Sequence, residues 1–139
     1  MGVSKTPAKQ LGVPTSSGTS NILPGVAVDA TVFIGSVVRM SGGTFVNAIA
    51  TSKALSFVFG ICVAKSSSTV GDILLPGGLT SAIYTGLDTT KEYFLSDSVA
   101  GEIAVPPVPT VAGRVVWLIG KPYTSDRLLF KPVLRVVRS

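Results

Sequence analysis

Regularly spaced turn clusters constrain this chain more than any other feature of its sequence. Between them lie short runs that are rich in valine, isoleucine, threonine and aromatic residues, as in residues 31–40 and 114–120. Such runs, bounded by glycine and proline every 8–12 residues, are typical of a β-sandwich or β-barrel. The turn clusters lie at residues 41–43, 66–69, 76–78, 97–101 and 122–126. The sequence therefore predicts an all-β fold, a small barrel or sandwich of jelly-roll or Greek-key type.

The apolar runs place the strands, and the last of them is expected at a sheet edge. Residues 55–65 form a continuous apolar run with Gly60 at its centre, which favours a buried strand. Gly35 inside the run 31–40 indicates a bulge or bend. Only residues 51–55 and 87–91 have the composition for a helical turn. Strands are expected at residues 26–28, 31–40, 44–46, 55–65, 70–75, 79–84, 92–96, 102–105, 114–120, 128–130 and 134–137.

The two halves of the chain show the same order of runs and turns, which indicates an internal repeat. Each half runs strand, glycine turn, short strand, loop, strong strand ending in glycine, turn, strand. Gly60 then corresponds to Gly120, and Gly43 corresponds to Gly101. Similar turn spacing is common in β-rich chains, so a chance match is the alternative.

Residues 1–25 form a separate segment, and residues 26–139 form one β-domain. The first 25 residues hold three prolines, four glycines and a serine/threonine cluster, so an extended N-terminal arm is expected. Apolar side chains and two lysines are spaced along it, which suits an arm that anchors on a neighbouring subunit. A loose terminal tail is the alternative. The predicted partner-binding residues are Lys5, Lys9, Leu11, Val13, Ile22 and Leu23.

The composition indicates a body whose surface is buried against other proteins. Charged residues make up 14% of the chain, well under the usual quarter, and the mean hydropathy is +0.55. We expect a homo-oligomer, with a trimer as the predicted state. The net charge of +5 is too sparse for a nucleic-acid stripe, so no nucleic-acid partner is expected. No apolar run reaches bilayer length, and the N-terminal lysines are followed by no signal-peptide core, so no membrane partner is expected.

Catalytic and metal chemistry is also not expected. The chain has no histidine and one cysteine, which excludes a Ser-His-Asp triad, a Cys-His dyad and a Cys/His zinc site. The seven carboxylates are scattered at turn positions, where aspartate commonly caps backbone N–H groups. Cys62 and Trp117 lie inside apolar runs and are interpreted as core residues. We therefore predict no enzyme activity, no catalytic residues, no cofactor and no metal.

The run from residue 86 to residue 132 resembles a pattern that recurs in virion proteins of tailed bacteriophages. The resemblance extends upstream to residue 31 through FIGSVVRMSGGTFVNAIA and FGICVA, and it departs from the pattern at Lys121 and Pro122. Its matching positions are Gly86, Leu87, residues 93–96 (YFLS), Gly101, Ile103, Pro106, Pro107, Gly113, Val115, Val116, Ile119, Gly120, Leu128 and Leu129.

The resemblance implies a structural protein of the virion rather than an enzyme. Related domains occur in head decoration (cement) proteins and in tail-fibre or tail-tip proteins. A short chain with an arm is more similar to a decoration protein, which is made in the host cytoplasm and binds the major capsid protein on the outside of the head. The alternative is a tail or tail-fibre module that binds a tail protein or a host glycan.

Overall fold

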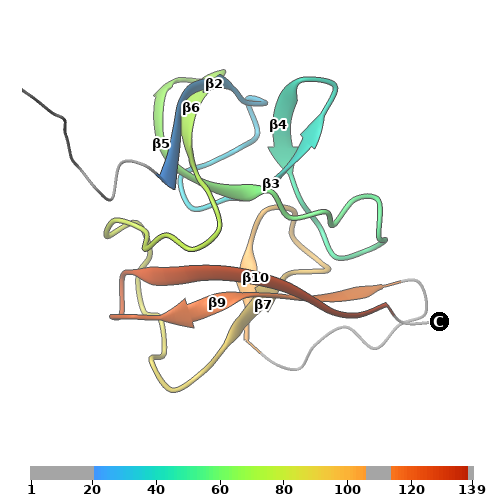
Figure 1. The fold of residues 1–139 in the computed structure, drawn as a ribbon, viewed down its shortest axis with the longest axis vertical. Helices are drawn as coiled ribbons and strands as arrows, with labels where there is room; N and C mark the ends of the chain where they lie inside the picture. The colour runs from blue at the N-terminus through green and yellow to red at the C-terminus, as the bar shows by residue number, and fades with distance from the viewer. Residues whose placement is uncertain (1–20, 106–113, 138–139) are drawn as a thin grey trace, which may run out of the picture.

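Nine strands form two antiparallel sheets in the computed structural model, which describes residues 21–105 and 114–137 (backbone only at 136–137). In Figure 1 the five-stranded sheet lies above the four-stranded sheet. The first sheet holds β2 (Ile22–Ala27), β3 (Val37–Ser41), β4 (Thr44–Asn47), β5 (Gly60–Ser67) and β6 (Val70–Leu74). The second holds β7 (Tyr93–Leu95), β8 (Ile103–Ala104), β9 (Val115–Pro122) and β10 (Leu128–Val137). The all-β, sandwich-like prediction is confirmed, and these described ranges contain no α-helix.

The predicted internal repeat is confirmed by the strand order. The first sheet runs β2-β6-β5-β3-β4 and the second runs β10-β9-β7-β8, so β3 to β6 and β7 to β10 are arranged identically. In the first half β5 pairs with β3 on the side away from β4, and in the second half β9 pairs with β7 on the side away from β8. A Greek key instead returns its fourth strand beside the first, so the order inside each half differs from that part of the prediction.

Two local features repeat along with the strands. Gly43 and Gly101 lie in the equivalent hairpin turns with φ of 86° and 83°, a region that favours glycine. An Asp-x-Thr motif precedes β3 and β7: the backbone N–H and the hydroxyl of Thr31 donate to Asp29, and those of Thr90 donate to Asp88. These bonds lower the pKa of both carboxyl groups. The motif, which the sequence alignment of the halves missed, supports a duplicated unit.

The outer edges of the two sheets differ from the predicted strands. β2 pairs with β6 from Ile22, so the arm that was expected to end at residue 25 ends before β2. The strand predicted at residues 79–84 is wrong: only Leu79 makes a bridge, to Leu129. The backbone then turns on itself, since the Ile83 N–H donates to the Ser81 carbonyl at 2.8 Å, and the Tyr84 N–H donates to the Asp126 carbonyl at 3.1 Å. Residues 77–80 nevertheless lie beside β10 much as β2 lies beside β6.

Two further expectations change in detail. The strands predicted at residues 128–130 and 134–137 form the single strand β10, which pairs with β9 through two register shifts. Pro132 is tolerated there because β10 is an edge strand. Residues 51–55 and 87–91 form turns rather than helix.

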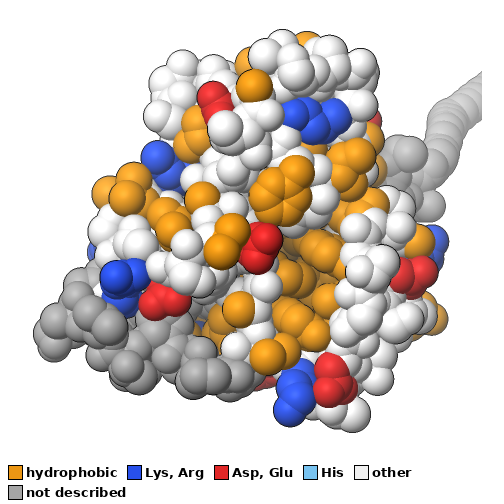
Figure 2. All heavy atoms as spheres, turned by 180° about the vertical axis from the view of Figure 1, so that it is seen from behind, with side chains coloured by type: hydrophobic (Ala, Val, Ile, Leu, Met, Phe, Trp, Pro, Cys, Tyr) orange, Lys and Arg blue, Asp and Glu red, His pale blue; other side chains and the backbone are white. Residues whose placement is uncertain are grey.

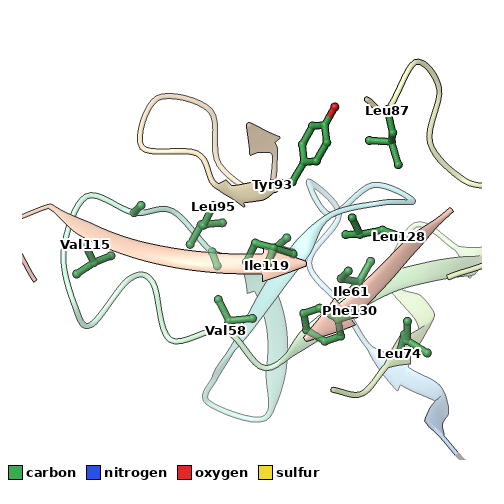
Figure 3. Packing of buried hydrophobic residues seen from close by; sticks show 13 residues of the cluster. Val58, Ile61, Leu74, Leu87, Tyr93, Leu95, Val115, Ile119, Leu128 and Phe130 are labelled. Carbon is green, nitrogen blue, oxygen red and sulfur yellow. The ribbon is translucent and has the colours of Figure 1, made fainter. Parts of the chain in front are cut away.

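The five-stranded sheet is buried on both of its faces. Neighbouring residues point to opposite faces of a strand. At the centre of this sheet three pairs of neighbours are apolar and buried: Val37 with Val38, Ile61 with Cys62, and Ile73 with Leu74. The larger cluster lies between the sheets and includes Ile61, Leu74 and Phe130 (Figure 3). The smaller cluster lies on the other face and includes Cys62 and Ile73. The core position predicted for Cys62 is confirmed.

Gly60 and Gly120 hold the same place in the two halves. Gly60 pairs with Val38 of β3, and Gly120 pairs with Tyr93 of β7. A Cβ atom on Gly60 would lie 2.7 Å from the Leu74 carbonyl oxygen, and one on Gly120 would lie 2.0 Å from the Leu129 carbonyl oxygen. Both contacts are with backbone, which cannot rotate away. Glycine is therefore required at each position.

We expect Gly120→Ala to lower the free energy of unfolding by about 3 kcal/mol, because the strands would have to separate. Gly86→Ala is the matched control: Gly86 has φ of 68° with nothing within 4 Å of the new Cβ, so it carries only the conformational cost of about 1–2 kcal/mol. Urea denaturation of both variants measures the difference. An equal loss in the two variants would contradict the close-approach account.

Candidate functional site

An open apolar groove of about 190 Å³ is the candidate partner-binding site. Three separate segments line it: the β2–β3 connection, the β6–β7 connection and the start of β8. Seen from behind, hydrophobic side chains gather in a hollow on this face with an acidic side chain on its rim (Figure 2). The lining residues are Phe33, Ile34, Gly35, Tyr84, Glu102 and Ile103. Both halves of the repeat therefore contribute to one site.

A tight turn before β3 exposes the apolar wall of this groove. The Ser36 N–H donates to the Phe33 carbonyl at 2.9 Å, and the Phe33 N–H donates to Ser36 Oγ at 2.9 Å. Gly35 has φ of 100°, which agrees with the predicted bend. Phe33 and Ile34 are left 41% and 48% exposed at the tip of the turn. The turn is thus fixed by hydrogen bonds while its large side chains stay available.

Tyr84, which lines the groove from the β6–β7 connection, forms a hydrogen bond to that turn. Its hydroxyl donates to the Gly35 carbonyl at 2.9 Å, and its ring lies 3.2 Å from the position of a Cβ on Gly35. Burial, with a smaller contribution from Cys62, raises the pKa of Tyr84 far above its ordinary value of 10.0. The phenol therefore stays protonated as a hydrogen-bond donor and has a structural role in the groove.

Glu102 gives the groove its charge. Within the described part of the chain, the Glu102 carboxylate makes no side-chain hydrogen bond or ion pair, whereas the other six carboxylates all do. Those six and their partners are Asp29 with Thr31, Asp72 with the Gly25 N–H, Asp88 with Thr90, Glu92 with Arg135, Asp97 with Arg114, and Asp126 with Thr124. An apolar groove with one unpaired anion suits a ligand that is apolar and carries a cation.

A second apolar surface lies where the chain leads into β5. Phe57 is 65% exposed and its ring centroid lies 6.2 Å from that of Trp117. The Trp117 indole N–H donates to Ser56 Oγ at 3.1 Å. Trp117 packs against the larger core cluster, as predicted, and its side chain is partly rather than fully buried. An indole at the rim of a core leaves its edge open to a partner.

The chemically reactive side chains of the described ranges include the seven carboxylates and Cys62. Among these residues no three side chains of histidine, cysteine, aspartate or glutamate gather where they could hold a metal ion. Burial raises the pKa of the Cys62 thiol, and its Sγ contacts the Ala64 carbonyl oxygen at 3.4 Å. A buried, protonated thiol is a poor nucleophile. Among the same residues, no helix has the length and apolar character needed to cross a bilayer.

The predicted partner-binding residues divide into two groups. Lys5, Lys9, Leu11 and Val13 lie outside the described residues. Ile22 and Leu23 belong to β2, where Ile22 packs against the larger cluster and Leu23 against the smaller one. Both side chains are partly buried and their strand pairs with β6, so their role in partner binding stays a prediction. Sequence analysis missed the groove, for which the apolar pair before Gly35 was the available signal.

No protein-family model, curated protein or solved structure matches this chain. Its function has to be inferred from the surfaces described above.

We expect Tyr84→Phe to lower the free energy of unfolding by about 1 kcal/mol between pH 6 and 9, because it removes the hydrogen bond to Gly35. Above pH 10 the phenol of the unfolded wild-type chain ionises, whereas the folded chain keeps its proton. The unfolded state then binds fewer protons, so wild-type stability falls by up to about 1.4 kcal/mol per pH unit. Tyr84→Phe lacks this group, so the two curves should converge in urea titrations above pH 10. A constant gap would contradict the buried, hydrogen-bonded phenol.

Proposed function

We propose that this protein is a structural component of a tailed-bacteriophage virion, a decoration protein that binds the outside of the head and stabilises contacts between major capsid proteins. The observation that carries the proposal is the exposure of large apolar side chains on a body with few charges. Twelve such side chains in the described ranges are exposed by 37% or more. Surfaces of this kind mark protein–protein contacts. The sequence resemblance to phage virion proteins supports the same assignment.

The proposal includes two partners, the major capsid protein and other copies of this chain. The groove and the Phe57 surface are formed by different residues, so one copy offers two apolar surfaces for different contacts. A trimer fits this arrangement, because a contact between two different surfaces closes into a ring when each copy is rotated by a third of a turn. The first 20 residues, which precede β2, form the arm that reaches a neighbouring subunit.

The alternative is a tail or tail-fibre module that binds a tail protein or host glycan, and one observation favours it. Tyr123 is 68% exposed in the turn between β9 and β10, close in sequence to Asp126. An exposed aromatic ring near a carboxylate is a common arrangement for stacking and hydrogen bonding to a sugar. Loss of host-glycan binding in Tyr123→Ala, with head binding absent in the wild type, would favour this alternative.

We expect deletion of residues 2–20 to leave the body folded, because β2 begins at Ile22. The truncated protein should bind expanded heads of the encoding phage at least about tenfold more weakly, which corresponds to about 1.4 kcal/mol. A co-sedimentation titration of heads that lack this protein measures the affinity. The matched control, Lys5→Gln with Lys9→Gln, should lose only the salt-sensitive part of binding. Undiminished binding of the deletion variant would contradict a clamping role for the arm.

A further inference from the structure

The groove has the features of a receptor for an extended segment. Its walls are apolar at Ile34 and Ile103, and Glu102 adds an anion without a partner in the described ranges. Its lining also includes Ile103 of β8, and within the described ranges β8 ends the sheet order and pairs only with β7. An edge strand offers free backbone groups to an incoming strand. The expected ligand is therefore an extended peptide with aliphatic side chains and a nearby cation.

This chain contains such a segment outside the described residues. Lys9, Leu11 and Val13 alternate with Gln10 and Gly12, so in an extended backbone the three side chains lie on one face, roughly 7 Å apart. Pro14 follows directly and favours an extended conformation at the residue before it. The groove volume of about 190 Å³ is room for one or two aliphatic side chains.

The length of the segment allows it to reach another molecule. Nine residue steps separate Val13 from Ile22, where β2 begins, and they span about 30 Å when extended. A body of this size has a radius of gyration of about 13–14 Å. The segment can therefore pass beyond its own body to the groove of an adjacent copy.

We propose that residues 9–13 of one copy occupy the groove of a second copy, with Leu11 and Val13 between Ile34 and Ile103 and the Lys9 ammonium beside Glu102. This deepens the proposed function by naming a receptor for the arm, and it rests on that function only for its setting on a particle. The contact joins two different surfaces, so successive copies form a ring or an open chain. The predicted trimer is a closed ring of three such contacts.

The first test is a peptide titration. A peptide of residues 5–15 is added to the variant that lacks residues 2–20, and the amide NMR signals of Gly35 and Ile103 are followed. We expect saturable shifts at these residues, and about a tenfold or greater loss of affinity with a Leu11→Ala peptide. No binding at millimolar peptide, or shifts confined to other residues, would overturn the proposal.

The second test asks whether the segment crosses between copies. The deletion variant has a groove and no arm, whereas Ile34→Glu has an arm and a blocked groove. Ile34 is 48% exposed, so this variant should fold, which thermal unfolding checks. We expect each variant alone to sediment as a monomer, and their mixture to form a heterodimer that cannot grow further. A mixture that stays monomeric would overturn exchange between copies.

Val133→Glu is the matched control for that test, because Val133 is 49% exposed and lies on β10 away from the groove lining. It should associate as the wild type does. Association of Ile34→Glu at the wild-type level would overturn the proposal. Neither test uses heads, so failure here leaves head binding open, and failure of head binding leaves these results unchanged.

The proposed ion pair between Lys9 and Glu102 is tested by exchanging the two charges. At low salt, Glu102→Lys in the deletion variant and Lys9→Glu in the peptide should each weaken binding by about two- to fivefold. Combining the two should restore the affinity, and the differences should shrink at 0.5 M salt, where the Debye length is only about 4 Å. A combination that binds no better than the single variants would overturn the placement of Lys9 beside Glu102.

Discussion

Burial of both faces of the five-stranded sheet is the constraint on which the rest of this structure depends. Ile61 and Cys62 are adjacent in β5 and both are fully buried, one in each core cluster. Such a sheet needs a cover on each face. The four-stranded sheet covers one face, and the connection between β2 and β3 covers the other with Val28 and Val32.

The groove follows from the way that connection returns to the sheet. After Val32 the chain has to reverse before β3, and the hydrogen-bonded turn at Gly35 does this with Phe33 and Ile34 pointing outward. The second half of the repeat brings Tyr84 and Ile103 against the same turn. Covering the second face of the sheet therefore leaves an apolar wall on the surface, and the duplicated unit supplies the opposite wall.

Much of the fold could be predicted because it depends on local sequence. The continuous apolar run through Gly60 predicted a buried strand, and the predicted correspondence of Gly60 with Gly120 agrees with the close approach of strands that the structure has at both glycines. The strand predicted at residues 79–84 failed because a local turn, in which the Ile83 N–H donates to the Ser81 carbonyl, follows the last hydrogen bond to β10 at Thr80. Ile22 and Leu23 were assigned to the arm because the prolines, glycines and serine/threonine cluster of residues 1–25 predicted no packed element, whereas their pairing with β6 is a long-range contact.

The groove could not be predicted in the same way. Its walls come from segments about 50 and 20 residues apart in sequence, and only the packing of the two halves brings them together. Trp117 shows the same limit, since its strand was predicted correctly while its partial exposure depends on how Phe57 and Ser56 cover it. Exposure of apolar side chains is a tertiary property, and it is the property that the functional proposal uses.

The copy number of this chain in purified virions of the encoding phage tests the central claim most directly. Quantitative mass spectrometry against the major capsid protein gives the ratio. A decoration protein bound across the head predicts hundreds of copies per particle, in a simple ratio to the capsid protein. A few copies per particle, or none, would contradict a role in stabilising the head.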